Sequence, residues 1–303
     1  MSKELSKLTI FTPTYNRENL LPKLYDSLLN QTNKNFVWLI VDDGSTDNTE
    51  EVVNKWINEK KIVIEYHKKK NGGKNTAIDF AHQHCETKYI GCVDSDDYLT
   101  NDAVDVLYNH FEKTDKNEKC IGLVGRRCKN NGEPFNSNWC TENLFLKFKE
   151  LSTKYHYNED TFLIFKTELI KKYIFPKIEG EKFITESVLY NQFMFDFDLY
   201  AFNELIYVAE YMEDGYTKQG LSLFFKNPEG YLYSLKQNLF YAVKYGNTIK
   251  TKIGLSARYY AWKKVTNIKD NFKNDYKIPG FYKIVGKLFS PIMTIRYKKK
   301  YKN

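Results

Sequence analysis

The sequence lacks several features that would place it in a familiar class. Its five cysteines form no CxxC pair and are odd in number, which disfavours a zinc ribbon or a complete disulfide framework and favours a reducing cytosol. No apolar run reaches the ~20 residues of a transmembrane helix. The polar start at residues 1–7 does not resemble a signal peptide. We therefore expect a cytoplasmic protein, with peripheral binding to the inner face of the plasma membrane left open.

Several ligand-binding motifs are also absent. Neither a Gly-x-Gly-x-x-Gly fingerprint nor a Walker A sequence follows the first predicted strand, which disfavours dinucleotide oxidoreductases and P-loop NTPases. The net charge of +8 comes without a recognisable nucleic-acid motif or a periodic basic face. We expect no nucleic-acid partner, and an anionic substrate or lipid explains the basic excess equally well.

The composition indicates a folded protein with a large core. Of the 303 residues, 42% are hydrophobic and 16% aromatic, which excludes a disordered chain. Strand-like and helix-like patterns alternate through the first half of the sequence, which is typical of βαβ units and predicts an α/β fold with a mostly parallel central sheet flanked by helices. The predicted strands are 8–11, 36–41, 62–66, 89–93 and 121–125, and the predicted helices around them are 20–29, 46–57, 75–85 and 103–111.

The second half is organised differently. Residues 126–226 are irregular, and amphipathic helical patterns return at 231–243 and 253–265. We expect one catalytic domain over 1–226, divided at residue 125, and a helical C-terminal region over 227–303.

Acidic residues follow two of the predicted strands. Asp42 and Asp43 end one strand, and the cluster Asp94-Ser95-Asp96-Asp97 follows another. Ligands of open α/β sheets bind outside the carboxyl ends of the strands. Three carboxylates together favour a divalent metal that carries phosphate oxygens, although acids also suit the first turn of a helix. Lys74, after two glycines, is placed to meet a diphosphate or simply follows a βα turn.

Five segments, taken in order over residues 8–115, resemble family 2 glycosyltransferases. The segments are Thr12-Pro13-Thr14-Tyr15-Asn16-Arg17, Ser27-Leu28-Leu29-Asn30-Gln31-Thr32, Val41-Asp42-Asp43-Gly44-Ser45-Thr46-Asp47, Asn71-Gly72-Gly73-Lys74 and Asp94-Ser95-Asp96-Asp97. The resemblance implies a GT-A fold, a nucleotide-diphosphate sugar donor, inversion at the anomeric carbon, and a divalent cation, Mn²⁺ or Mg²⁺, bound through a DxD element. Residues 1–125 would then bind the donor and 126–226 the acceptor.

The resemblance also implies roles for individual residues. Asp96 and Asp97 would hold the metal. The residues expected to bind the nucleotide sugar are Pro13, Asp42, Asp43, Lys74, Asp94, Ser95 and Asp96.

The resemblance is weaker in the second half. Family members place a catalytic carboxylate at a helix start after the sheet, and Glu186 occupies the matching point, with Glu181 as its nearest rival and a helix start without chemistry as the alternative. A base there would be kept ionised by the helix N-terminus. The loop 213–222 contains no histidine for the metal, and Lys218 and Gln219 are candidates for contacting the diphosphate.

The expected reaction is transfer of one sugar, with UDP-sugar as the expected donor, to a hydroxyl of a glycan or lipid-linked acceptor, as in bacterial surface-polysaccharide synthesis. The Gln-x-x-Arg-Trp motif of processive synthases is absent. A non-catalytic sugar-nucleotide-binding protein and a nucleotidyltransferase are the alternatives.

The tail over 281–303 mixes apolar side chains with lysines and tyrosines. This composition is typical of an interfacial helix on an anionic membrane surface. A helix that packs on the domain with its basic end exposed is the equal alternative.

Overall fold

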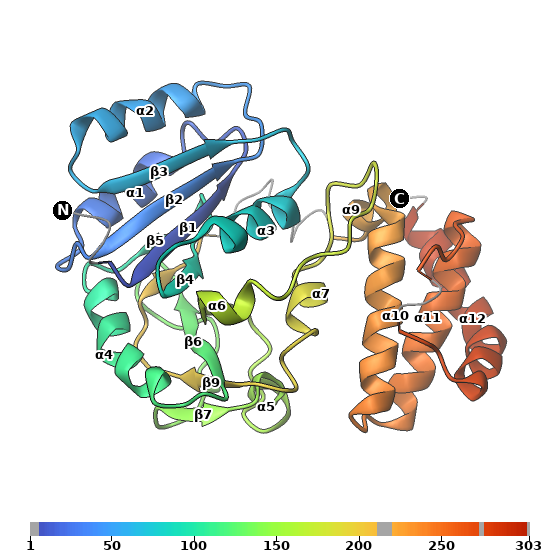
Figure 1. Ribbon diagram of the computed structural model, residues 1–303. Coiled ribbons are helices and arrows are strands. Elements are labelled where there is room, and N and C mark those ends of the chain that lie inside the picture. Colours follow the sequence, from blue (N-terminus) through green and yellow to red (C-terminus); the bar gives the residue numbers. More distant parts are fainter. Residues whose placement is uncertain (1–5, 211–219, 273–275, 302–303) are drawn as a thin grey trace. The chain divides into compact units, whose positions relative to one another are not determined.

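The computed structural model describes residues 6–210, 220–272 and 276–301 (Figure 1). The chain forms two compact units, one made of Met1–Ile174 with Phe193–Met212 and the other of Phe175–Gln192 with Glu213–Asn303. The units alternate along the chain, whereas the expected domains, 1–226 and 227–303, are consecutive. That domain boundary stays a prediction.

The first unit is an α/β structure, as predicted. Its elements in chain order are β1 (Leu8–Thr14), α1 (Leu21–Leu29), β2 (Phe36–Asp42), α2 (Thr49–Glu59), β3 (Val63–Lys68), α3 (Lys74–His84), β4 (Tyr89–Cys92), β5 (Tyr98–Leu99), α4 (Ala103–Asp115), β6 (Cys120–Cys128), β7 (Leu144–Leu146), α5 (Phe148–Thr153), β8 (Thr161–Lys166), α6 (Thr167–Ile170), β9 (Asp198–Ala201) and β10 (Tyr207–Val208).

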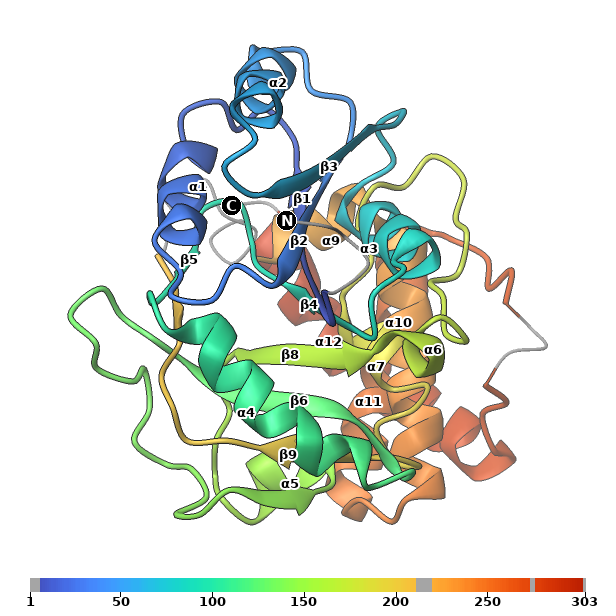
Figure 2. The same ribbon diagram turned by 60° about the vertical axis from the view of Figure 1, so that its left-hand side comes forward.

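These strands form one mixed sheet in the order β3-β2-β1-β4-β8-β6-β10-β5, with β9 beside β6 and β7 beside β9. β3, β2, β1 and β4 are parallel, as their βαβ connections require. β8 is antiparallel to both of its neighbours and lies between β4 and β6 (Figure 2). The sheet is therefore parallel over β3, β2, β1 and β4, whereas β6, the last strand of the regular alternation, lies in its mixed part.

The core of this unit lies between the sheet and its helices. All seven residues of β2 are buried, which is typical of a parallel strand covered on both faces. The rings of Tyr25 on α1 and Trp56 on α2 stack with centroids 4.2 Å apart, and Trp56 also stacks on Trp38 of β2 at 5.8 Å. These three aromatic side chains fix both helices on one face of the sheet.

The second unit is helical, in agreement with the predicted C-terminal extension. It contains α7 (Ser187–Tyr190), α9 (Leu221–Lys226), α10 (Pro228–Lys244), α11 (Ile249–Thr266) and α12 (Gly280–Tyr301). Leu232, Leu239 and Trp262 are fully buried between these helices. The indole N–H of Trp262 donates to the Pro228 carbonyl at 2.9 Å, at the start of α10. Within the described ranges, no helix is both long and apolar enough to cross a membrane.

Candidate active site

The predicted acids lie at one edge of the sheet. β1, β2 and β4 are parallel neighbours, so Asp42, Asp43 and the cluster after β4 follow strands that end on the same side. The acids differ in their hydrogen-bond partners. Some carboxylates are bonded to the loops around them, and others have oxygens that a ligand can contact.

Asp42 holds the turn that follows β2. It is completely buried, its Oδ1 accepts from the Ser45 amide at 2.7 Å, and its Oδ2 accepts from the Tyr66 hydroxyl at 2.5 Å. Both carboxylate oxygens therefore have donors within the protein. A contribution of Asp42 to ligand binding would act through the loop that it stabilises.

Asp43 ties β2 to the loop before α3. Its carboxylate accepts from the amides of Gly72 at 2.9 Å and Gly73 at 2.6 Å, and it pairs with the ammonium of Lys69. Gly73 has a φ of 90°, a backbone conformation in which a residue with a side chain would be strained. The side chain of Asp43 is only 6% exposed, so it shapes the loop as well as being the predicted nucleoside contact.

Three buried acceptors near this loop have no hydrogen-bond partner among the described residues. They are the Thr14 hydroxyl oxygen and the amide oxygens of Asn71 and Asn75. Thr14 ends β1 opposite Asp42, and the two asparagines lie on either side of Lys74. Buried polar atoms without partners are costly, so these oxygens indicate a place where a ligand with N–H or O–H groups would be favourable.

Lys74 joins the two acidic strand ends. It is the first residue of α3, and its Nζ lies 2.7 Å from Oδ1 of Asp94, with 22% of each side chain exposed. Burial alone would raise the pKa of Asp94, but the positive charges of Lys74 and Arg127 outweigh it and lower that pKa. Asp94 is therefore held as an anion beside a partly exposed ammonium.

Asp96 lies next to this ion pair. Burial and the charge of Asp94 raise its pKa. Its own amide partly opposes this shift, and among the described residues no other hydrogen-bond donor acts on its pKa. The oxygens of Asp96 thus remain available to a ligand. Ser95 is 7% exposed between the two acids.

Asp97 is a buried member of a network below the cluster. Its Oδ2 accepts from the Tyr207 hydroxyl at 2.6 Å and its Oδ1 from the Glu210 amide at 2.9 Å. Burial and the nearby charge of Asp94 raise its pKa to about 7. The Tyr207 hydroxyl also accepts from the Asp94 amide at 3.1 Å, so one side chain joins the backbone of Asp94 to the carboxylate of Asp97, on the two sides of Asp96. Asp97 contacts protein donors through both oxygens, unlike Asp96.

Arg127 and Tyr207 are residues of this network that the sequence analysis did not identify. They are register partners on β6 and β10, and the Arg127 guanidinium lies 4.5 Å from the centroid of the Tyr207 ring and 3.7 Å from Oδ2 of Asp97. Nearby anions raise the pKa of Arg127 despite its burial. The sequence contained one signal for Arg127, which is the pair of arginines directly after the predicted strand 121–125. It contained no such signal for Tyr207, which lies in an irregular stretch.

The acids are chemically suited to a hard divalent cation. Carboxylate oxygens are the ligands that Mg²⁺ and Mn²⁺ prefer, and Mg²⁺ commonly uses one or two of them with substrate phosphates. Asp96 meets this description, with Asp94 as its neighbour. Across residues 6–210, 220–272 and 276–301, however, no group of three His, Cys, Asp or Glu residues forms a complete cation site. The donor set fits a cation that is shared with a diphosphate.

Glu186 and Glu181 belong to the second unit. Glu186 immediately precedes α7 and its Oε2 accepts from the Tyr190 hydroxyl at 2.9 Å, so it stands at a helix start as predicted. Glu181 instead caps α10, accepting from the amides of Glu229 at 2.6 Å and Gly230 at 2.7 Å. That structural task makes Glu181 a poor base. The catalytic role of Glu186 stays a prediction, and Lys218 and Gln219 lie outside the described residues.

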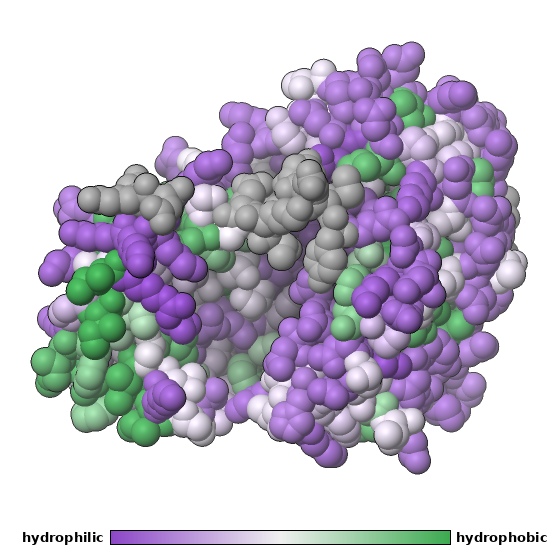
Figure 3. All heavy atoms as spheres, turned by 180° about the vertical axis from the view of Figure 1, so that it is seen from behind, coloured by the Kyte–Doolittle hydropathy of each residue, from purple (hydrophilic) through white to green (hydrophobic). Residues whose placement is uncertain are grey.

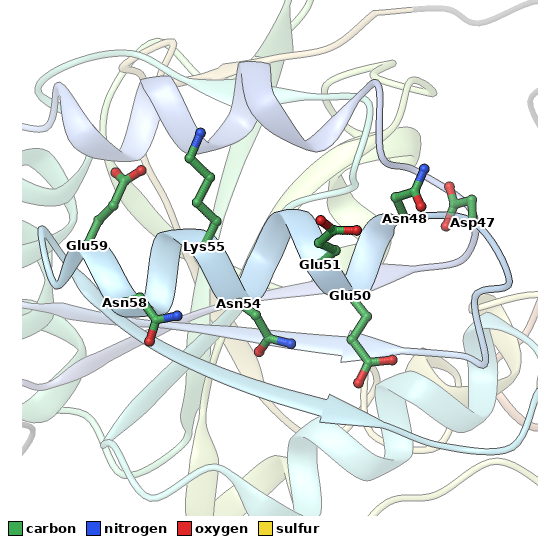
Figure 4. Close-up of a pocket in the computed structure, with 8 residues that line it drawn as sticks. All are labelled: Asp47, Asn48, Glu50, Glu51, Asn54, Lys55, Asn58 and Glu59. Carbon is green, nitrogen blue, oxygen red and sulfur yellow. The ribbon is translucent and has the colours of Figure 1, made fainter.

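A shallow depression runs along α2 (Figure 4). Its lining residues come from α2 and the turn before it, and they include neither Asp42 and Asp43 nor any residue of the cluster 94–97. Asp47, for example, accepts from the amides of Glu18 and Thr49. We regard this surface as a solvated helix face. Its lining residues are Asp47, Asn48, Glu50, Glu51, Asn54, Lys55, Asn58 and Glu59.

The sequence resembles characterised proteins over the region of these acids. The family model described as "Glycosyl transferase family 2" matches residues 9–174, more than half of the chain. The chain is 40% identical over 126 residues to chondroitin synthase from Pasteurella multocida, a match that covers 41% of this chain and only 13% of that relative.

Solved structures share the fold. TarS from S. aureus, in complex with UDP-GlcNAc, has a TM-score of 0.62 at 16% identity, covering 98% of this chain and 91% of TarS. The mannosyltransferase PcManGT from Pyrobaculum calidifontis, in complex with GDP-Man and Mn²⁺, has a TM-score of 0.54 at 15% identity, covering 97% and 82%. These likenesses bear out the predicted GT-A fold, and the family match goes further. The chain belongs to glycosyl transferase family 2, a family of sugar-transferring enzymes, and the strand-end acids lie within the matched region.

Proposed function

We propose that this chain transfers a single sugar, with inversion, from a UDP-sugar to a hydroxyl of a glycan or lipid-linked acceptor, in a reaction that requires Mn²⁺ or Mg²⁺. The observation that carries the proposal is the Lys74–Asp94 ion pair beside Asp96, at the same sheet edge as Asp43 and its loop. This edge offers an ammonium to phosphate oxygens and a carboxylate to a cation within one group of loops.

The nucleoside is proposed to lie on the side of β1 and β2, against Pro13 and Asp43. The unpartnered oxygens of Thr14, Asn71 and Asn75 support this placement, because a base or a ribose supplies the N–H and O–H groups that they lack. The UDP-GlcNAc complex of TarS, which shares the fold, supports a UDP-sugar in particular. The GDP-Man complex of PcManGT makes a guanine nucleotide the nearest alternative.

The cation is proposed to be held by Asp96 with diphosphate oxygens, beside Asp94 and Ser95. When bound, it would offset negative charge on the departing nucleoside diphosphate. Asp97 is proposed to act by fixing the backbone of the cluster through Tyr207 and Glu210, rather than as a direct ligand as predicted from the sequence. Lys74 would contact the diphosphate from the start of α3.

Glu186 is proposed as the base. It would take the proton from the acceptor hydroxyl as that oxygen bonds to the anomeric carbon, while the bond from that carbon to the diphosphate oxygen breaks and the electron pair leaves with the nucleoside diphosphate. A single displacement of this kind inverts the anomeric carbon. Surface-polysaccharide synthesis is the proposed setting, and the similarity to a chondroitin synthase supports it.

The test is a UDP-release assay on the purified chain with a panel of UDP-sugars, Mn²⁺ and oligosaccharide or lipid-linked acceptors. Asp96→Asn and Glu186→Gln should each lower the transfer rate by roughly a hundredfold or more, because each removes a group needed in the transition state. Glu168→Gln, an 87% exposed carboxylate in a short helix, is the matched control and should transfer normally.

Normal transfer by Glu186→Gln would refute the base assignment alone. A wild-type chain that is stabilised by UDP-sugars but neither transfers nor hydrolyses them would instead support the non-catalytic alternative.

A further inference from the structure

One face of α12 is packed against the rest of its unit. Tyr282, Ser290, Thr294 and Tyr297 are buried on this face, and they recur every three to eight residues along one side of the helix. Gly286 lies on the same side, where a Cβ would come within 2.0 Å of the Ser256 Oγ on α11. The hydroxyl of Ser256 donates to the Tyr282 carbonyl at 2.6 Å. α12 is therefore a fixed part of the helical unit.

The opposite face of α12 is apolar and exposed. Phe281, Ile284, Leu288, Ile292 and Ile295 are each 58–72% exposed. Their spacing of three or four residues places them in one stripe, defined here as the α12 stripe, and Phe289 lies at its edge with 41% exposed. Figure 3 shows hydrophobic side chains gathered on one face of the helical unit. These residues include most of the large exposed hydrophobic side chains in the described ranges.

Positive charge surrounds the stripe. α12 carries six cationic side chains, Lys283, Lys287, Arg296, Lys298, Lys299 and Lys300, and no acidic residue. Lys283 and Lys287 lie one residue before Ile284 and Leu288, on the border between the exposed stripe and the packed face. An exposed apolar stripe of this kind is typical of a surface that binds a partner. The matching partner offers apolar groups to the stripe and negative charge to the lysines around it.

We propose that the α12 stripe binds the interface of an anionic lipid bilayer, with α12 lying in the plane of the membrane. The apolar side chains would enter the boundary between headgroups and acyl chains, and the flanking lysines would meet lipid phosphates. A second copy of the chain fits less well, because two α12 helices would bring twelve cations together. The two sequence-based alternatives for the tail combine: α12 packs on its unit with one face and offers the other to the membrane.

The inference goes beyond the proposed transfer reaction and does not depend on it. Membrane attachment would hold the chain at the surface where a lipid-linked acceptor resides. Vesicle binding needs neither a donor nor a functioning catalytic base, so failure of either proposal can be recognised separately.

The test is co-sedimentation of the full chain with phosphatidylcholine vesicles, with and without phosphatidylglycerol. The wild type should bind the anionic vesicles, and binding should weaken with added salt. The triple variant I284S/L288S/I292S keeps the charge and should lose on the order of a hundredfold in affinity, because three apolar side chains no longer enter the bilayer. K283Q/K287Q/K298Q should lose a similar factor on anionic vesicles only, at about fivefold for each charge.

The matched control is I174S/I249S, which removes two exposed apolar side chains outside α12 and should bind normally. Circular dichroism confirms that each variant is folded. Failure of the wild type to bind anionic vesicles would overturn the proposal, as would unchanged binding by the folded serine triple variant. A shift from dimer to monomer in the triple variant, without any vesicle binding by the wild type, would assign the stripe to self-association instead.

Discussion

Replacing Lys74 by Met should weaken diphosphate binding much more than it weakens the fold. The Lys74–Asp94 pair is 2.7 Å apart with 22% of each side chain exposed, so solvent screens it and its loss should cost about 1 kcal/mol of stability or less. A hydrogen bond from an ammonium to a phosphate is worth about 1.5–3 kcal/mol, and its loss should reduce UDP affinity by roughly tenfold to a hundredfold. The methionine keeps most of the apolar volume of the lysine stem.

Isothermal titration with UDP and with uridine separates the phosphate contribution from the nucleoside contribution. The Lys74→Met variant should bind UDP more weakly and uridine as the wild type does, because the base and ribose are proposed to lie by Asp43. Lys70→Met removes one charge from an exposed position in the same loop and serves as the control. An equal loss of affinity for uridine, or full UDP affinity without Lys74, would refute the assignment of Lys74 to the diphosphate.

Three further predictions concern stability and can be measured by denaturant or thermal unfolding. Asp43→Ala should cost about 2–4 kcal/mol, because the amides of Gly72 and Gly73 and the ammonium of Lys69 lose their acceptor; an unchanged unfolding midpoint would show that the loop does not need this carboxylate. Tyr207→Phe should cost about 1–3 kcal/mol through loss of the hydroxyl between Asp94 and Asp97, and an equally stable variant would mean that water replaces it. Lys236→Met should cost about 3–5 kcal/mol, because it leaves the largely buried carboxylate of Asp270 without its cationic partner; a loss under 1 kcal/mol would show that the donors of Tyr259 and Phe272 suffice. Burial alone would raise the pKa of Asp270, but Tyr259 and Lys236 outweigh burial and lower that pKa. The resulting stabilisation is fully present above the unfolded pKa near 3.8 and is lost as the pH falls through the lower folded pKa. The free energy of unfolding of Lys236→Met should therefore depend less on pH in that window.

The regular part of the fold was predictable because each element carries its own pattern. The predicted strands 36–41 and 89–93 differ by one residue at an end from β2 and β4, whose apolar runs are buried on both faces. β8 is the contrast, because Thr161–Lys166 is too short to be distinguished from other apolar runs, and its position depends on partners far away in the chain. Local pattern therefore predicted the parallel half of the sheet, and of the mixed half it predicted only β6, as the strand 121–125.

The candidate site divides in the same way. Asp43, Lys74, Asp94 and Asp96 follow strand ends or start a helix, so topology alone predicts that they lie at one edge. The sequence could not show that Asp42 and Asp97 are occupied by internal donors, since Tyr66, Tyr207 and Glu210 reach them through tertiary structure. Whether Glu186 completes the site is a prediction that rests on sequence resemblance.

From the position of β10 we expect the acidic cluster to be completed late in folding. The hydroxyl of Tyr207 reaches Asp97 across 110 positions of the chain, and β8 joins β4 only after about 70 further residues have been added to that strand. Contacts at such separations form late because closing a long loop is entropically costly. During synthesis the parallel strands and their helices can form first, with the acids still hydrated and β4 still an open edge. We expect donor binding to begin only after residue 210 has left the ribosome, so truncated chains that contain every predicted donor-binding residue should still fail to bind the nucleotide.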